Sequence, residues 1–279
     1  MNRRHEYRTL WISDVHLGTR EAKASFLLNF LRCNAADQLY LVGDIFDGWA
    51  LQRSWYWPAS HNDVLQMLLR RARSGTDITY IPGNHDEAAR AFPGLDFGGI
   101  LVQAQATHTT ADGRRMLVLH GDEFDGVVRH ARWISLLGAC AYSGILKLNR
   151  HFNRVRRWLD LPYWSLSAYL KYKTKRAVQF IADFEHAVAR EARQHGVDGV
   201  VCGHIHHAEM RSIDGVLYAN TGDWVESCTA LAEHHDGRLE IIRWVPTAHD
   251  GVASPAAAPY GQGDGYAQGD VSVEVAARP

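Results

Sequence analysis

The chain has 279 residues, enough for one large domain or two small ones with a substantial core. Hydrophobic residues make up 46% and charged residues 22%, which is ordinary for a soluble globular protein. The net charge of −1 excludes a globally basic nucleic-acid-binding protein, although single segments can still be strongly charged. The four cysteines form no Cys-x-x-Cys pair, so we expect reduced thiols in a cytosolic protein.

No apolar segment reaches the length of about 20 residues that a membrane-spanning helix needs. The longest candidate, 134–146, is too short. The N-terminal residues lead directly into the first expected strand without the apolar region of a signal peptide. We therefore expect a cytoplasmic protein that is at most attached to a membrane surface.

Strands and helices alternate through the first 120 residues. The apolar runs predict buried strands at 9–13, 39–42, 78–81 and 116–119. Between the first three strands, helical spacing of apolar residues predicts helices at about 20–31 and 64–73. This alternation favours an α/β fold with parallel central strands.

The second half of the chain begins with a basic, aromatic segment. Residues 129–176 carry eleven basic side chains interleaved with aromatic ones, and Asp160 is the only acid among them. We expect helices here, broken near Pro162. The elements expected after it are a helix at about 174–195, a strand at 197–202, and short antiparallel strands at 216–219, 229–233 and 239–244. Residues 247–279 are rich in Ala, Gly, Pro and Asp, which predicts a disordered tail.

Polar residues follow five of the expected strands. A single carboxylate after a strand more often caps a turn or a helix than binds a ligand. In this chain polar residues follow several strands, and functional loops gather at strand ends. The residues concerned are Asp14, His16, Asp44, Asn84, His85, Asp86, His120, His204 and His206. Their repetition predicts one metal-binding rim.

Aspartate, histidine and asparagine together suit divalent Mn, Fe, Zn or Mg, which accept carboxylate, imidazole and amide oxygen ligands in mixed sets. Two metals about 3.5–4 Å apart need a shared ligand, and a carboxylate can bridge where an imidazole cannot. Asp44 follows a central strand and is the natural bridge.

The complete motif set resembles the calcineurin-like metallophosphoesterase superfamily. The motifs occur in family order across residues 14–206, as Asp14-x-His16, Gly43-Asp44-x-x-Asp47, Gly83-Asn84-His85-Asp86, His120-Gly121-Asp122 and Gly203-His204-x-His206. The resemblance implies a sandwich of two central mixed β-sheets flanked by helices. We expect one domain over 1–246, with the basic aromatic segment, about 126–175, inserted as a helical cap over the metal rim.

The resemblance also assigns roles. It places Asp14, His16, Asp44 and His206 on a first metal, and Asp44, Asn84, His120 and His204 on a second. It places His85 at the phosphoryl group and the leaving oxygen, with Asp86 as the carboxylate that orients it. The implied cofactors are two divalent ions, Mn²⁺ first and Fe, Zn or Mg as alternatives, that turn a bridging water into the attacking hydroxide. Asp47 and Asp122 are equally consistent with turn residues and stay outside the metal set.

The extended motif Gly-Asp-x-Phe-Asp-x-Trp at 43–49 points to one branch of this superfamily. It is similar to the UDP-2,3-diacylglucosamine pyrophosphatases of lipid A biosynthesis, whose cap holds two acyl chains. This implies cleavage to UMP and 2,3-diacylglucosamine 1-phosphate, and peripheral contact with the inner leaflet of a membrane. The substrate contacts it implies are Trp49, Arg154, Arg157 and Tyr163. In the best-known branch of that family an arginine stands where this chain has His85.

The sequence is also consistent with other functions. A phosphoesterase of the same superfamily could act on nucleotides, nucleotide-sugars or nucleic acid, and a basic cap could follow a nucleic-acid backbone. The apolar residues between the charges of the cap argue against nucleic acid, and the cap could also simply pack on the core. A non-catalytic metal-bearing scaffold is disfavoured by the complete set of Asp14, Asp44, Asn84 and His85. His61 is expected either to cap its helix or to contact substrate. The sequence leaves the oligomeric state open.

Overall fold

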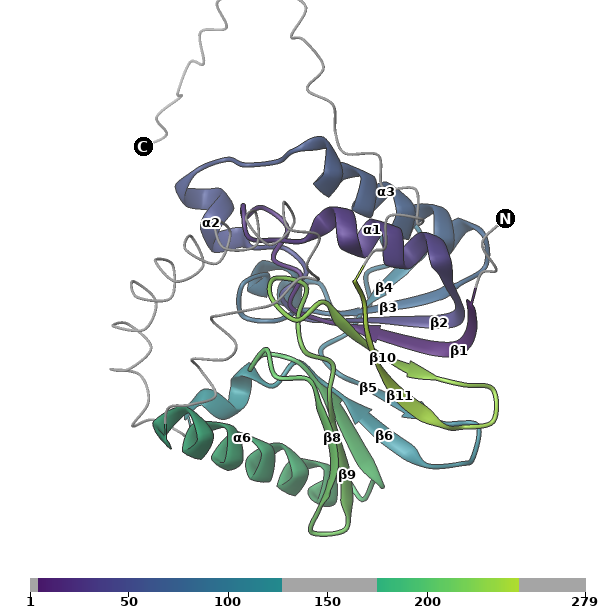
Figure 1. The fold of residues 1–279 in the computed structure, drawn as a ribbon, viewed down its shortest axis with the longest axis vertical. Helices are drawn as coiled ribbons and strands as arrows, with labels where there is room; N and C mark the ends of the chain where they lie inside the picture. The colour runs from purple at the N-terminus through teal and green to yellow at the C-terminus, as the bar shows by residue number, and fades with distance from the viewer. Residues whose placement is uncertain (1–4, 127–174, 246–279) are drawn as a thin grey trace, which may run out of the picture.

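The computed structural model describes residues 5–126 and 175–245 of the chain. Two mixed β-sheets pack face to face, and helices lie on their outer faces (Figure 1). This arrangement confirms the expected α/β sandwich. The cap predicted at about 126–175 and the tail predicted at 247–279 lie outside the described residues, apart from Gly126 and Lys175 at the ends of the cap.

The first sheet has six strands in the order β11-β10-β1-β2-β3-β4. Its members are β1 (His5–Ile12), β2 (Asn34–Val42), β3 (Asp77–Ile81), β4 (Ile100–Val102), β10 (Thr229–Glu233) and β11 (Leu239–Arg243). Strands β1 to β4 are parallel, and β10 and β11 are antiparallel to their neighbours. The parallel strands place the residues after β1, β2 and β3 at one edge of the sheet.

The second sheet has five strands in the order β5-β6-β7-β9-β8. Its members are β5 (Ala106–Thr109), β6 (Arg115–Val118), β7 (Gly199–Cys202), β8 (Glu209–Ile213) and β9 (Val216–Asn220). Strand β9 pairs in parallel with β7 and antiparallel with β8. The strand expected at 216–219 is therefore antiparallel to β8, as predicted, but parallel to β7, which was not predicted. Strand β8 itself was missed, because its largely polar sequence gives no strand pattern.

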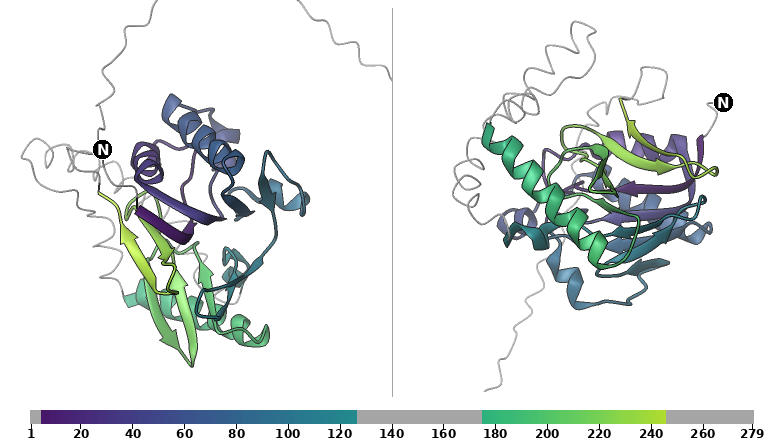
Figure 2. Two further views of the ribbon diagram at one scale, coloured as in Figure 1. Left: turned by 90° about the vertical axis from the view of Figure 1, so that its right-hand side faces the viewer. Right: turned by 90° about the horizontal axis from the view of Figure 1, so that it is seen from below.

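The helices cover the outer faces of the two sheets. Helices α1 (Ala24–Cys33) and α3 (Ala59–Arg73) lie over the six-stranded sheet, and α6 (Lys175–Gln194) lies over the five-stranded sheet (Figures 1 and 2). The short α2 (Gly48–Arg53) and the 3-10 helices η1 (Glu87–Ala91) and η2 (Asp122–Gly126) belong to the loops at the strand ends. Helix α1 begins four residues later than expected.

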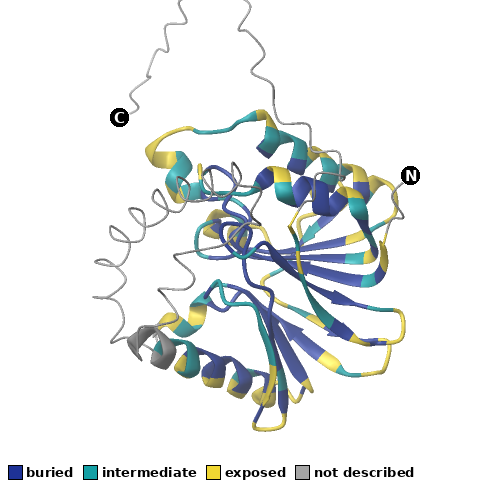
Figure 3. Ribbon diagram, viewed as in Figure 1, coloured by how far each residue is buried: buried dark blue, intermediate teal, exposed yellow. Residues whose placement is uncertain are grey.

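Three apolar clusters hold the layers together. One joins α1 and α3 to the six-stranded sheet, and a second joins α6 to the five-stranded sheet. The third lies between the sheets, where Trp11 and Ile81 face Met116 and Val201. Figure 3 shows the central strands mostly buried, with exposed residues on the outer helix faces, the hairpin tips and edge strands such as β8. A fixed inter-sheet core in turn fixes how the loops of one sheet meet those of the other.

Within the described ranges, none of the helices combines the length and the apolar character that crossing a membrane requires.

Candidate metal centre

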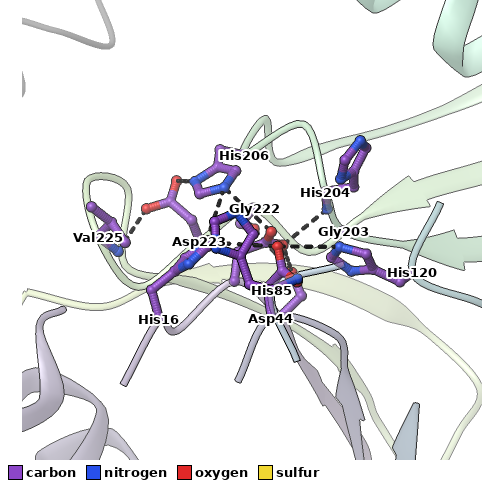
Figure 4. A network of polar contacts seen from close by, with 12 residues as sticks. His16, Asp44, His85, His120, Gly203, His204, His206, Gly222, Asp223 and Val225 are labelled. Carbon is purple, nitrogen blue, oxygen red and sulfur yellow. Dashed lines mark hydrogen bonds and ion pairs between the residues drawn. The ribbon is translucent and has the colours of Figure 1, made fainter. Parts of the chain in front are cut away.

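Loops from both sheets converge at one edge of the sandwich. Asp14 and His16 follow β1, Asp44 follows β2, and Asn84 follows β3. His120 follows β6, and His206 lies in the loop after β7. Figure 4 shows His16, His120 and His206 arranged around Asp44. The five strand ends singled out in the sequence therefore meet in space.

The first cluster contains Asp14, His16 and His206, whose potential ligand atoms all lie within 4.8 Å of one another. His206 Nε2 lies 3.3 Å from Asp14 Oδ1 and 3.4 Å from His16 Nε2. Two imidazole nitrogens and a buried carboxylate facing one another form a donor set that suits a divalent transition metal. These are three of the four residues expected on the first metal.

The second cluster contains Asp44, His120 and His204, again with potential ligand atoms within 4.8 Å of one another. His120 Nε2 lies 3.4 Å from Asp44 Oδ2. Asn84, the fourth expected ligand, immediately precedes His85, whose backbone N–H donates to Asp44 Oδ1 at 2.8 Å. The structure thus brings six of the seven expected ligands into two compact groups, while His16 also belongs to a third group with Asp47 and His85.

Asp44 lies between the two clusters. Its Oδ1 is held by the His85 N–H, while its Oδ2 lies 3.4 Å from His120 Nε2 and 3.8 Å from His16 Nε2. Burial acts to raise the pKa of Asp44, but the contact with His120 and the charge of neighbouring histidines hold that pKa well below its ordinary value. One ionised oxygen therefore faces a histidine of each cluster, which is the geometry of a bridging ligand.

Polar contacts on the far side of each imidazole, hydrogen bonds for His120 and His16 and a longer ion-pair contact for His206, face Nδ1 and leave Nε2 toward the centre. His120 Nδ1 is 3.0 Å from the Val42 carbonyl, which can only accept, so in the neutral ring the proton is on Nδ1 and the lone pair is on Nε2. His16 Nδ1 lies 3.2 Å from Asp47 Oδ2, and His206 Nδ1 lies 4.0 Å from Asp223 Oδ2. All three histidines thereby direct Nε2 toward the centre.

Backbone strain is concentrated at this rim. Seven of the described non-glycine residues have a positive φ, and five are expected ligands with φ between 51° and 68°: Asp14, His16, Asp44, His204 and His206. Such conformations are uncommon for side chains of this kind and persist where surrounding structure enforces them. Glycine neighbours give the room needed, since a Cβ on Gly43 or Gly83 would collide with the His120 ring.

The donor set fits a pair of divalent cations. Asn84 Oδ1 is buried and accepts no hydrogen bond from any described residue, which is costly for an amide oxygen unless a cation occupies the site. Burial raises the pKa of Asp14 to about 6, so an unneutralised Asp14 carboxylate is also unfavourable there. Positive charge between the two clusters would satisfy both groups at once.

The structure corrects the expected partner of His85. The resemblance gave Asp86 the orienting role, but Asp47 Oδ2 lies 3.1 Å from His85 Nδ1. The Asp86 carboxylate instead accepts backbone N–H groups of Gly83 at 2.5 Å and Ile45 at 2.8 Å, with longer contacts to two more. Asp86 therefore holds the two loops that carry Asp44 and Asn84 together.

Asp47 makes three contacts, and the sequence alone could not show which of them it would make. Its Oδ1 accepts the Ala50 N–H at 2.7 Å and caps α2, and its Oδ2 contacts both His16 and His85. These contacts lower the pKa of Asp47 in spite of its burial. The sequence signal for a role of Asp47 at the site was its position in the Gly-Asp-x-x-Asp motif. Asp223 and Asp125, whose Oδ1 lies 2.8 Å from His204 Nε2, gave no motif at all.

Of the expected substrate contacts, only Trp49 is described. Its ring centroid lies 4.2 Å from that of His85, at an interplanar angle of 38°. Trp49 is therefore at the site, packed on the expected catalytic histidine. Arg154, Arg157 and Tyr163 lie outside the described residues.

Residues 7–208 match the calcineurin-like phosphoesterase family, a span that covers both clusters and most of the chain. The chain belongs to the calcineurin-like phosphoesterases. This phosphoesterase is a metal-dependent hydrolase, as its family and its two donor clusters together require.

Curated relatives of this phosphoesterase include proteins named UDP-2,3-diacylglucosamine hydrolase. The one from Photorhabdus laumondii is 25% identical over 253 residues, covering 83% of this chain and 93% of the relative. The one from Chromohalobacter salexigens is 27% identical over 236 residues, covering 77% and 88%. Among solved structures, a mutant Vps29 from Entamoeba histolytica is 14% identical and covers 86% of this chain and 99% of its own, with a TM-score of 0.40.

His61 is not the N-cap of α3, which is Pro58. His61 lies within the first turn of α3, is buried, and its Nδ1 accepts the Gly18 N–H at 3.1 Å. The rings of Tyr56 and Trp57 meet it edge-on. His61 therefore holds the loop that follows β1, two residues beyond the ligand His16.

Because only a neutral imidazole can accept that bond, the contribution of His61 to stability depends on pH. Burial lowers the pKa of His61, so its stabilisation is present above the unfolded value of about 6.5 and is lost as the pH falls below it. We expect His61→Leu to lower the free energy of unfolding by about 1–2 kcal/mol at pH 8 and by less at pH 5. Urea denaturation at both pH values measures this, with the exposed His235→Leu as control. A deficit independent of pH would contradict it.

Proposed function

We propose that this phosphoesterase hydrolyses the pyrophosphate of UDP-2,3-diacylglucosamine to UMP and 2,3-diacylglucosamine 1-phosphate, with two divalent ions, Mn²⁺ first. The observation that carries the two-metal part is Asp44 Oδ2, which lies within 3.8 Å of a histidine of each donor cluster. The names of the curated relatives, at about a quarter identity over most of the chain, support the substrate.

The two ions, when bound, supply the charge that acidifies water and neutralises the phosphoryl oxygens. Asp44 would be shared between the two ions, and the remaining expected ligands would hold one ion on each side of it. Asp47 holds Nδ1 of His85 at 3.1 Å, which leaves Nε2 to donate to the oxygen that departs from the α-phosphorus. Packing of Trp49 against the His85 ring holds that imidazole in place.

A cavity of about 330 Å³ lies beside His85. Its walls include Phe46, Trp49, Tyr80 and Ala89. Since His85 acts at the leaving oxygen, a group attached to that oxygen would enter this cavity first. Its aromatic and aliphatic lining suits the apolar part of a diacylated glucosamine better than a second charged nucleotide.

We also propose that residues of about 126–175 form a cap that meets acyl chains and an anionic membrane surface. Eleven basic side chains between 129 and 176, interleaved with aromatic ones, support this part of the proposal. It implies a cytoplasmic protein at the inner face of the membrane. Binding to vesicles with and without anionic lipid tests it, and equal binding to both would contradict it.

The function is tested by UMP release from UDP-2,3-diacylglucosamine by purified protein with Mn²⁺. We expect release, and a rate at least about tenfold lower for the deacylated analogue, because the apolar contacts are lost. Cyclic nucleotides, UDP-sugars without acyl chains and single-stranded DNA form the comparison panel. A clear preference for one of these would assign the other phosphoesterase activity, and no UMP release with Mn²⁺, Fe²⁺, Zn²⁺ or Mg²⁺ would refute the proposal.

A further inference from the structure

Arg90 connects two loops at the edge of the metal centre. It lies in η1, and its Nε and Nη2 donate to the Pro82 carbonyl at 3.2 and 3.0 Å. Its Nη1 and Nη2 also donate to the two carboxylate oxygens of Asp122, at 2.9 and 2.5 Å. We call Arg90, Pro82 and Asp122 together the Arg90 clamp.

The clamp joins loops that come from different sheets. Pro82 follows β3 of the six-stranded sheet and precedes Asn84 by two residues. Asp122 follows β6 of the five-stranded sheet and stands two residues after His120. The two sheets share no strand pairing, so side-chain contacts must set the distance between these loops.

The clamp also reaches a third ligand. Asp122 is the first residue of η2, and Asp125 in the same short helix accepts from His204 Nε2 at 2.8 Å. Fixing the start of η2 therefore fixes the carboxylate that orients His204. Asn84, His120 and His204 are the residues expected on the second metal besides the bridging Asp44. None of the first metal's other ligands, Asp14, His16 and His206, lies in the two loops that the clamp joins.

The effect of the clamp should be local. Arg90 is 39% exposed and Asp122 is 10% exposed, so solvent screens the ion pair and it adds little to global stability. A bidentate guanidinium–carboxylate pair nevertheless has a strict geometry, which a lysine cannot reproduce. The Arg90–Asp122 pair therefore contributes to the positions of the two loops and not to global stability.

We propose that Arg90 is a positioning residue for the second metal, acting through Pro82 and Asp122 on Asn84, His120 and His204. This inference rests on the two-metal site of the proposed function. Residues outside the ligand shell that orient ligands typically change metal affinity by about 10–100-fold. We therefore expect loss of the clamp to weaken the second metal by about tenfold or more and to leave the first unchanged.

Mn²⁺ titration of the metal-stripped full chain tests this, with bound metal counted by calorimetry and elemental analysis. Wild type should bind two ions per chain and show the paramagnetic resonance spectrum of a coupled pair. Arg90→Ala should bind the first ion normally and the second at least about tenfold more weakly, with the spectrum of isolated ions at equal loading. Arg90→Lys should fall between them. Excess Mn²⁺ should restore turnover in both variants.

Arg114→Ala is the matched control, because Arg114 also bridges a carboxylate and a carbonyl. It contacts Asp112 Oδ1 at 3.0 Å and the Gly237 carbonyl at 2.9 Å, at the opposite end of β6 from His120. Two ions bound by Arg90→Ala with wild-type affinity, or both ions lost together, would overturn the inference. If Arg90→Ala does not fold, Asp122→Asn gives the same comparison. A wild type that binds one ion would instead refute the two-metal proposal itself.

Discussion

Replacing Asp44 with alanine is expected to remove both metals and almost all activity. Asp44 Oδ2 faces His120 at 3.4 Å and His16 at 3.8 Å, so its loss removes a ligand from both sites and their only bridge among the described residues. If the pair of ions supplies about 4 kcal/mol of charge stabilisation in the transition state, turnover should fall by about 10³-fold. Metal analysis after gel filtration, together with phosphodiester hydrolysis, measures both effects.

A suitable control for Asp44→Ala is Asp112→Ala, which removes a partly exposed carboxylate at the β5–β6 hairpin. That variant should keep two metals and wild-type turnover. The bridging assignment would be wrong if Asp44→Ala still bound two ions per chain, or if it lost one ion and kept the other at full affinity.

His85→Ala should separate chemistry from metal binding. His85 lies 3.1 Å from the Asp47 carboxylate and forms a separate group of possible donors with His16 and Asp47, outside the two groups that contain Asp14 and Asp44. We expect two bound metals and a turnover lowered by about 10²–10⁴-fold, the usual contribution of a positioned acid. Steady-state kinetics and metal content on the same preparation are the measurements.

The partner of His85 provides the comparison for that variant. Asp47→Asn should lower turnover less than His85→Ala, because the imidazole remains but loses its charge partner. Asp86→Asn should instead weaken the fold of both loops, since Asp86 accepts their backbone N–H groups. Equal loss of metal in His85→Ala and Asp44→Ala would contradict this division of roles.

The part of this site that the sequence could predict is the part set by strand ends. Asp14, Asp44 and Asn84 follow buried parallel strands, and parallel strands deliver their ends to one edge. That rule was enough to expect a shared rim from periodicity alone, and the family motifs then divided its members between two metals. The parallel pairing of β1, β2 and β3 followed from the same alternation of strand and helix.

What the sequence could not predict depends on side-chain direction and long-range contact. Asp47 and Asp86 both stand near His85, and only the loop conformation decides that Asp47 reaches the imidazole while Asp86 turns to backbone N–H groups. Asp125 contacts His204 across 79 positions of sequence. The parallel pairing of β9 with β7 likewise depends on β8, whose polar residues give no alternating pattern.

The most direct test of the two-metal account is UMP release from UDP-2,3-diacylglucosamine by metal-stripped protein as Mn²⁺ is returned in measured equivalents. The account predicts no release without metal, little with the first equivalent, and full activity once the second site fills. Undiminished release after metal removal, full activity with one ion per chain, or no release with both sites filled would contradict it.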